Sequence, residues 1–228
     1  MGLKSYSKIG LPSRSVIFDL DGTLIDSQES ILNTIQLALR QVGVSAQIPM
    51  TKELVGPPLN EVISKITGIS DKSILNEIGA KFKLNYDLLG YKESIVYPGI
   101  NKFLFNLHSQ GFILHIATNK RSIPTKKILE YFSWSQIFST VYSIDSREGA
   151  PFEGKAEMIF ALLKGESISS GSAVYVGDRF EDYEAATIND LRCIVVDWGY
   201  GFNNNYQDVG MRCVSNIPSL KRAIESML

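Results

Sequence analysis

Short runs of apolar residues alternate along the chain with longer stretches in which apolar residues recur every three or four positions. The short runs lie at about residues 16–18, 112–117, 141–144, 173–176 and 193–196 and are typical of buried β-strands. The longer stretches are typical of amphipathic helices. Strands that alternate with helices need crossover connections, so the pattern predicts a Rossmann-like α/β fold, a doubly wound parallel sheet covered on both faces.

The segment at about residues 26–94 departs from this alternation. It contains three helical patterns, at about 27–43, 59–68 and 71–89, and no convincing strand. Ser27 is expected to cap the first of these helices, and Gly56-Pro57-Pro58 interrupts the chain before the second. We therefore expect an α/β core domain formed by residues 1–25 and 95–228, with a small all-helical domain at 26–94 inserted after the first strand.

Composition excludes several classes of protein. Of the 228 residues, 44% are hydrophobic and 21% charged, as in ordinary soluble proteins, and the net charge of −1 gives no reason to expect nucleic acid or a membrane as a partner. No run approaches the ~18 apolar residues of a membrane span, and residues 1–14 contain no signal peptide. Cys193 and Cys213 lack metal-site spacing and suit a reducing compartment. We expect a cytoplasmic protein that is a monomer or a weak homodimer.

Two acids follow the first predicted strand, in the segment Asp19-Leu20-Asp21-Gly22-Thr23. In an extended chain Asp19 and Asp21 point to the same side, roughly 6 to 7 Å apart. Carboxylates this close repel each other unless a cation lies between them or one is protonated. Mg²⁺ is a fitting cation, and it leaves one acid free for covalent or proton chemistry. The structural alternative is a strand end with acidic turn residues.

Polar residues also follow other predicted strands: Thr118 and Asn119, then Asp178, then Asp197. Ligands of doubly wound sheets bind at the carboxyl ends of strands, near the point where strand order reverses, so the first two groups are expected to converge with the acids after the first strand. Each has a structural alternative. Thr118 and Asn119 are suited to cap the next helix, Asp178 to sit in a turn, and Lys155 to be a solvated charge at the start of a helix.

In their order and spacing, these residues resemble the four sequence motifs of the haloacid dehalogenase superfamily of phosphohydrolases. The matching residues are Asp19-Leu20-Asp21-Gly22-Thr23, Thr118 in Ala-Thr-Asn-Lys, Lys155, and Gly177-Asp178 with Asp182 four residues on. The helical segment resembles the α-helical cap of the phosphoglycolate phosphatase and β-phosphoglucomutase type. The tail Trp198-Gly199-Tyr200-Gly201 is similar to that of the phosphoglycolate phosphatase branch.

This resemblance implies a Mg²⁺-dependent phosphatase that acts on a small phosphorylated metabolite. Asp19 would attack phosphorus and form an aspartyl phosphate, and Asp21 would exchange a proton with the leaving group and then with water. The resemblance assigns the metal to Asp19, Asp178 and the backbone carbonyl of Asp21, and the phosphoryl oxygens to Thr118, Asn119 and Lys155. Asp182 would bind the metal through water or orient Lys155.

Two other functions stay open at this point. A phosphosugar mutase of the β-phosphoglucomutase type would keep the same acids but shield the aspartyl phosphate from water. A non-catalytic phospho-ligand binding protein on the same scaffold is disfavoured by the presence of Asp19 and Asp21. Arg179, where the family has a small hydroxyl residue, would narrow the site or pair with Asp182, and Ala156 replaces the proline that often follows the motif lysine.

Overall fold

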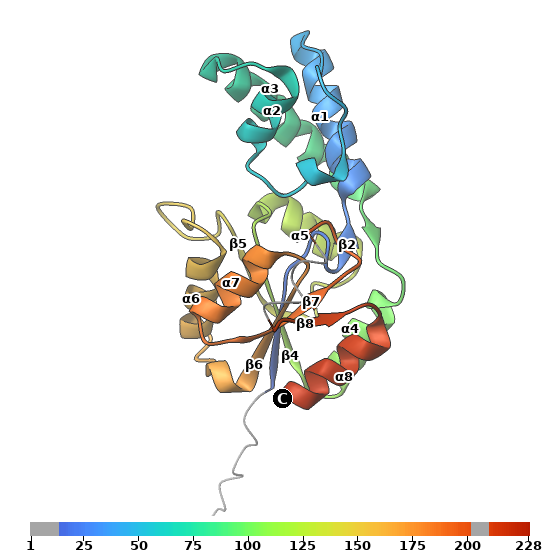
Figure 1. Ribbon diagram of the computed structural model, residues 1–228, viewed down its shortest axis with the longest axis vertical. Helices are drawn as coiled ribbons and strands as arrows, with labels where there is room; N and C mark the ends of the chain where they lie inside the picture. The colour runs from blue at the N-terminus through green and yellow to red at the C-terminus, as the bar shows by residue number, and fades with distance from the viewer. Residues whose placement is uncertain (1–13, 202–209) are drawn as a thin grey trace, which may run out of the picture.

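The computed structural model describes residues 14–201 and 210–228; most of the N-terminal segment, residues 1–13, lies outside this range. The described chain contains a six-stranded sheet in the order β5-β4-β1-β6-β7-β8, with every neighbouring pair parallel (Figure 1). Its strands are β1 (Ser15–Phe18), β4 (Ile113–Thr118), β5 (Phe138–Ser143), β6 (Ala173–Gly177), β7 (Arg192–Val196) and β8 (Arg212–Val214). The predicted parallel sheet is confirmed.

Helices cover both faces of this sheet. Side chains alternate along β1, so Val16 and Phe18 enter one hydrophobic cluster, while Ile17 enters a second cluster on the opposite face. The first cluster includes residues of α4 (Ile100–Ser109), α5 (Ser122–Tyr131) and α8 (Ile217–Met227), and the second includes residues of α6 (Lys155–Gly165) and α7 (Phe180–Ile188). The chain therefore forms the doubly wound architecture expected from its pattern.

The remaining helices form a separate layer beyond the carboxyl ends of the strands (Figure 1). They are α1 (Gln28–Val42), α2 (Leu59–Thr67) and α3 (Lys72–Leu88), with single turns at η1 (Lys52–Leu54) and η2 (Gly90–Glu93). These elements enclose a third hydrophobic cluster, which includes Ile35, Ile63 and Ile78. The chain leaves and re-enters the α/β part through two short antiparallel strands, β2 (Ile25–Asp26) and β3 (Ile95–Val96). A narrow two-stranded connection thus joins this helical layer to the sheet.

One local expectation is wrong. Ser27 precedes α1, but its side chain makes no capping hydrogen bond. The hydroxyl instead donates to the carboxylate of Asp21 at 2.5 Å. Because Asp21 offers a charged acceptor, it competes successfully with the backbone N–H groups of the helix. The strand β8 and the helix α8 were not anticipated from the sequence, and they extend the sheet by one strand and one covering helix.

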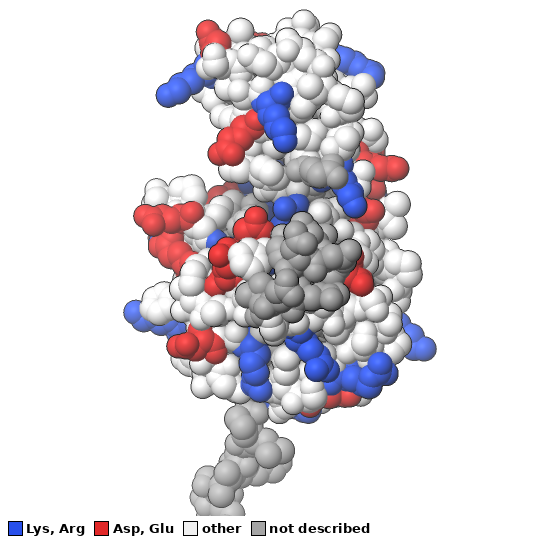
Figure 2. Space-filling model, viewed as in Figure 1, with Lys and Arg blue, Asp and Glu red and all other residues white. Residues whose placement is uncertain are grey.

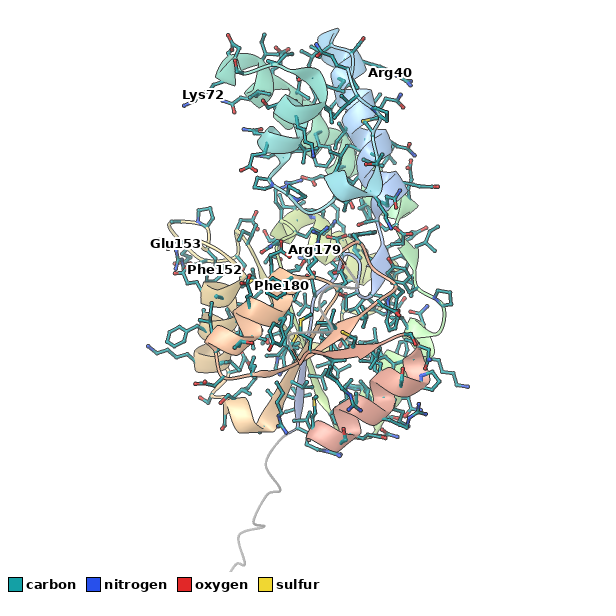
Figure 3. The ribbon with its side chains drawn as sticks, viewed as in Figure 1. Arg40, Lys72, Phe152, Glu153, Arg179 and Phe180 are labelled. Carbon is teal, nitrogen blue, oxygen red and sulfur yellow. The ribbon has the colours of Figure 1, made fainter. Side chains whose placement is uncertain are left out.

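The surface shows no dominant charge on the face drawn in Figure 2, where basic and acidic side chains are interspersed. Figure 3 places Arg179 where the α/β part meets the helical layer, whereas Arg40 and Lys72 lie at the far end of that layer. Within the described ranges, no helix combines the length and the apolar character needed to cross a bilayer. Both cysteines, Cys193 and Cys213, are free thiols.

Candidate active site

Asp19 lies directly after β1, at the centre of the sheet. Its backbone N–H donates to the carbonyl of Val176 at 2.9 Å, which holds the residue beside the end of β6. The carboxylate is buried, and its Oδ2 lies 3.1 Å from the ammonium of Lys155. Its Oδ1 has no hydrogen-bond partner among the described residues. A buried carboxylate oxygen without a partner is costly, so this atom is suited to a ligand that the protein does not itself supply.

Lys155 begins α6, and its side chain is only 7% exposed. Its ammonium also lies 2.5 Å from Oδ1 of Asp182. Burial opposes the charge, but the carboxylates of Asp182 and Asp19 outweigh this and raise the pKa of Lys155. The alternative of a solvated helix-start charge is therefore wrong.

Asp182 is fully buried in the first turn of α7. Its Oδ2 accepts from the backbone N–H groups of Asp178 and Arg179 at 3.1 and 3.0 Å, while Oδ1 also receives the hydroxyl of Tyr175 at 3.4 Å. These donors occupy both oxygens. Asp182 therefore holds the ammonium of Lys155 in place, and a water-mediated contact between Asp182 and a metal stays a prediction.

Asp178 follows β6 and is fully buried. Its Oδ2 accepts from the backbone N–H groups of Tyr200 at 2.8 Å and Gly201 at 3.3 Å, so the chain after β7 folds over the acid. A Cβ on Gly22, whose φ is +82°, or on Gly199 would lie within 2.4 Å of this side chain. The two glycines therefore leave the space that the carboxylate occupies.

Three buried acids meet at this point. Oxygens of Asp19, Asp178 and Asp182 all lie within 4.8 Å of one another. Burial, opposed by Lys155 and reinforced by the neighbouring carboxylates, raises the pKa of Asp19 to about 6. Burial, followed by the charges of Asp182 and Asp19, raises the pKa of Asp178 to about 7. One ammonium does not balance three carboxylates, and the oxygen-rich donor set fits a hard divalent cation such as Mg²⁺.

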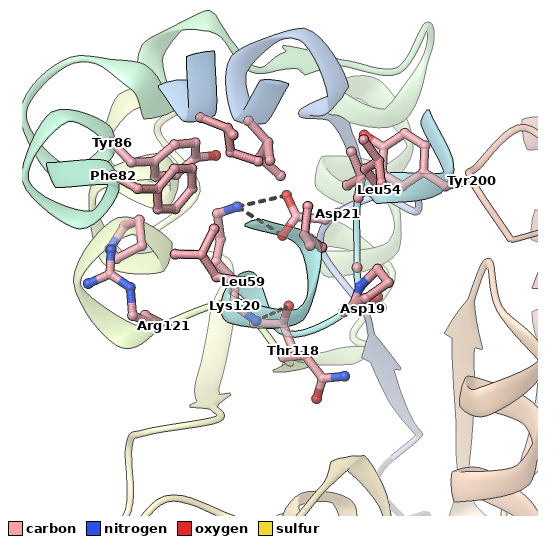
Figure 4. Close-up of a pocket in the computed structure, with 18 of the residues that line it drawn as sticks. Asp19, Asp21, Leu54, Leu59, Phe82, Tyr86, Thr118, Lys120, Arg121 and Tyr200 are labelled. Carbon is pink, nitrogen blue, oxygen red and sulfur yellow. Dashed lines mark hydrogen bonds and ion pairs between the residues drawn. The ribbon is translucent and has the colours of Figure 1, made fainter. Parts of the chain in front are cut away.

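The carboxylate of Asp21 has different partners from that of Asp19. Strand β1 ends at Phe18, and the chain turns between residues 20 and 25 instead of continuing extended. The two oxygens of Asp21 each lie 2.9 Å from the ammonium of Lys120 (Figure 4). Its Oδ1 also accepts from the hydroxyl of Ser27. Sequence reasoning missed Lys120, whose signal was its position two residues after Thr118. The backbone carbonyl of Asp21 as a metal ligand stays a prediction.

Thr118 ends β4 and is buried, while Asn119 is exposed. The Thr118 hydroxyl accepts from the backbone N–H of Lys120 at 3.2 Å. Helix α5 begins after Arg121, and the backbone N–H of its first residue, Ser122, donates to Asp145 at 2.7 Å, so the helix-capping alternative for Thr118 and Asn119 is wrong.

All six residues predicted for the site lie in one region. Asp19, Asp21, Thr118, Asn119 and Lys155 line a single cavity of about 270 Å³ between the sheet and the helical layer. Asp178 lies beside Asp19 in the acid cluster. Among the residues lining this cavity in Figure 4, Asp19 and Thr118 come from the strand ends, while Leu54, Phe82 and Tyr86 come from the helical layer. Residues distant in sequence therefore share one pocket, at the strand-order reversal next to β1.

A doubly wound sheet here gathers a buried acid cluster and a paired lysine under a helical layer, an arrangement suited to an α/β enzyme of the phosphoryl-transfer class. The family model described as haloacid dehalogenase-like hydrolase matches residues 16–196. The chain belongs to this family.

Relatives place it in the phosphoglycolate phosphatase-like branch. The phosphoglycolate phosphatase of Aliivibrio fischeri is 26% identical over 223 residues, which cover 93% of this chain and 96% of that protein. The 5′-nucleotidase of Pseudomonas aeruginosa is 28% identical over 192 residues, covering 82% and 84%. The solved structure of Mycobacterium tuberculosis Protein Tyrosine Kinase A aligns with a TM-score of 0.76 at 28% identity, over 94% of this chain and 99% of that one. The family and its phosphatase members identify the chain as a phosphoric monoester hydrolase.

Proposed function

We propose that the protein is a Mg²⁺-dependent phosphatase that hydrolyses a small phosphomonoester in two displacements, through an aspartyl phosphate on Asp19. The observation that carries this proposal is the buried carboxylate of Asp19, whose Oδ1 has no partner and whose Oδ2 lies 3.1 Å from Lys155. The relatives named as phosphoglycolate phosphatase and 5′-nucleotidase support a phosphomonoester substrate. Splitting one difficult displacement into two lowers each barrier.

The cation would be held by Asp19, Asp178 and the backbone carbonyl of Asp21, with Asp182 fixing the geometry behind them. When bound, it neutralises carboxylate and phosphate charge that otherwise opposes attack. Lys155, held by Asp182 at 2.5 Å, carries its positive charge to the transferring phosphoryl group. Thr118 and Asn119 line the same cavity and donate to the remaining phosphoryl oxygens.

Asp21 protonates the leaving alkoxide and later accepts a proton from the attacking water. In the structure its carboxylate is bound to Lys120 and Ser27. A substrate that enters the cavity therefore competes with these two donors for the same carboxylate. This competition links substrate entry to α1, because Ser27 immediately precedes that helix.

Residues 26–94 act as a cap domain on a core formed by residues 1–25 and 95–228. The two-stranded connection β2–β3 is the path by which the chain crosses between them. The cap supplies one wall of the cavity and excludes water from it during the reaction. Arg179 contributes to this arrangement, because its guanidinium donates across the boundary to the carbonyl of Val55.

Phosphate release from a panel of phosphomonoesters tests the proposal. The panel contains 2-phosphoglycolate, nucleoside 5′-monophosphates and a hexose 1-phosphate, each with Mg²⁺ and with EDTA. At least one substrate is turned over with Mg²⁺, EDTA stops the reaction, and Asp19→Asn abolishes it. Asp197→Asn is the matched control, because Asp197 also follows a strand but is exposed. Full activity in Asp19→Asn, or isomerisation of the hexose phosphate without phosphate release, contradicts the proposal.

A further inference from the structure

The wall that the helical layer contributes to the cavity is apolar. It consists mainly of the side chains of Ile31, Ile35, Leu54, Leu59, Val62 and Phe82. Ile35, Leu54 and Val62 are buried, so the wall is continuous with the hydrophobic cluster inside the layer. The leaving group of a phosphomonoester held at Asp19 is the part that meets this wall. An apolar wall favours a leaving group with an apolar body, because both surfaces are then removed from water.

Two aromatic rings give this wall a specific shape. Phe82 and Tyr86 lie one turn apart on α3, with ring centroids 5.4 Å apart and an angle of 18° between the ring planes. Both rings line the cavity, but Tyr86 is buried, whereas Phe82 is partly exposed (Figure 4). A stacked pair with one accessible member is suited to accept a third flat ring.

Three of the five cations that line the cavity are already paired with acids, which leaves few free charges for a small acidic leaving group. Lys120 is paired with Asp21, and Lys155 is paired with Asp182. Arg121 forms two hydrogen bonds to Asp87, at 2.6 and 3.0 Å.

Arg179, as described above, donates to the carbonyl of Val55. Among the lining cations in the part of the chain that the structure describes, Lys83 alone makes no ion pair or hydrogen bond, and it is exposed. Arg179 makes no ion pair within the described ranges, so a second anionic group, such as the carboxylate of phosphoglycolate, would find its guanidinium and the exposed ammonium of Lys83 beside an apolar surface.

We infer that the preferred substrate is a phosphomonoester whose leaving group carries a flat ring, and that Phe82 is the residue that selects it. This inference rests on the phosphatase function proposed above. The cavity of about 270 Å³ suits a phosphoryl group with one ring system. The ring belongs either to a nucleobase or to a simple aryl group, and both present the same flat apolar face to Phe82.

Matched substrate pairs test the inference. One pair is a nucleoside 5′-monophosphate and ribose 5-phosphate, which differ by the base. The other is benzyl phosphate and ethyl phosphate, which differ by the aryl ring. We expect kcat/KM of the ring-bearing member to exceed that of its partner about tenfold in at least one pair, and the pair that shows it identifies the source of the ring. 2-Phosphoglycolate is expected to be a poorer substrate than the ring-bearing member.

Variants of α3 test whether Phe82 causes the preference for ring-bearing substrates. Phe82→Ala and Phe82→Leu are both expected to lower the ring-to-ringless ratio of kcat/KM toward one, and Phe82→Leu does so while keeping an apolar side chain in the wall. Leu84→Ala is the control, since Leu84 lies on the same helix, is 57% exposed and does not line the cavity. Its ratio stays at the wild-type value.

Hydrolysis with equal rates for both members of each pair, or a ratio that Phe82→Leu leaves intact, overturns the inference and leaves the phosphatase function standing. Absence of turnover with every substrate, including the ringless ones, contradicts the phosphatase function itself. The two failures are therefore distinguishable in the same set of assays.

Discussion

The ammonium of Lys120 lies 2.9 Å from both carboxylate oxygens of Asp21, and the two side chains are only 7% and 19% exposed. The same ammonium lies 4.7 Å from the centroid of the Tyr86 ring. One lysine thus connects the acid after β1 to helix α3 of the helical layer. Because the phosphate chemistry proposed here needs Asp21, its resting contact with Lys120 bears directly on mechanism and stability.

Removal of Lys120 tests the strength of this contact. Lys120→Met leaves a poorly solvated carboxylate with one remaining donor, Ser27, so the free energy of unfolding is expected to fall by about 1–3 kcal/mol. The double variant Lys120→Met/Asp21→Asn recovers most of the loss, because no unpaired charge remains. Urea denaturation of the wild type, the single variant and the double variant measures the free energy of unfolding of each. Lys126→Met, which replaces an exposed lysine, is the control. Equal losses in the single and double variants would show that the pair is not coupled.

Replacement of Asp21 separates its role from that of Asp19. With Asp21→Asn, kcat/KM for an alkyl phosphate, which reports on the step that forms the aspartyl phosphate, is expected to fall about 10²–10⁴-fold, because the alkoxide leaves without a proton. The loss is smaller for p-nitrophenyl phosphate, whose leaving group needs no protonation. Steady-state kinetics on both substrates give the comparison. An equal loss on both would assign Asp21 to positioning and not to proton transfer.

The raised pKa values of Asp19 and Asp178, about 6 and about 7, predict how Mg²⁺ affects stability. Without metal, the folded state binds more protons than the unfolded state above about pH 4, so stability falls as the pH rises through these two values. A bound cation favours the ionised carboxylates. Mg²⁺ is therefore expected to raise the melting temperature more at pH 8 than at pH 5.

The comparison is made between samples with and without Mg²⁺ at each pH. This matters because burial lowers the pKa of His115 to about 4, which makes stability rise between about pH 4 and 6.5, opposite to the effect of the two acids. His115 lies in β4 and forms a hydrogen bond with Thr140. Its effect on stability is the same with and without Mg²⁺, so it cancels when the two melting temperatures at one pH are subtracted. A Mg²⁺ effect that is equal at both pH values would contradict the assignment of the acids.

Gly199 tests the shape of the acid cluster. A Cβ at this position would lie 2.3 Å from Cβ of Asp178 and 2.4 Å from the carbonyl oxygen of Gly22, so the backbone or the acid must shift. Gly199→Ala is expected to weaken Mg²⁺ binding at least about tenfold, because ligand positions must be kept within tenths of an ångström. Gly171→Ala is the control, since its nearest neighbour would be a hydroxyl 3.8 Å away. Isothermal titration calorimetry with Mg²⁺ measures the affinity of both variants. Equal affinities in Gly199→Ala and Gly171→Ala would contradict the prediction.

The sequence predicted the elements whose apolar pattern is strong. The run before Asp19 and the run before Asp178 are fully buried strands, and hydrophobic periodicity is the signal that such strands carry. The strand β8 has three residues, of which Val214 alone is buried, so its pattern is too short to recognise. The resemblance to the family's motifs assigned Asp19 and Lys155, 136 positions apart, to one site, and the structure brings them to 3.1 Å.

Other parts of the site were not predictable because they depend on contacts between distant residues. Lys120 pairs with a residue 99 positions away, and its position two residues after Thr118 does not by itself distinguish it from a solvated lysine. Ser27 was assigned to the backbone of α1, since a serine before a helix commonly caps it, but a carboxylate nearby is the stronger acceptor. The stacked rings of Phe82 and Tyr86 match ordinary helix packing until the cavity beside them is known.

The central claim is that Asp19 becomes phosphorylated during turnover. Borohydride reduces an acyl phosphate to an alcohol, so quenching the enzyme during turnover with substrate and Mg²⁺ should convert Asp19 to homoserine, which peptide mass spectrometry assigns to a single residue. Homoserine is expected at residue 19 with substrate and Mg²⁺ present, and none when either is omitted. Reduction at a different carboxylate, or an active enzyme in which Asp19 is never reduced, would contradict it.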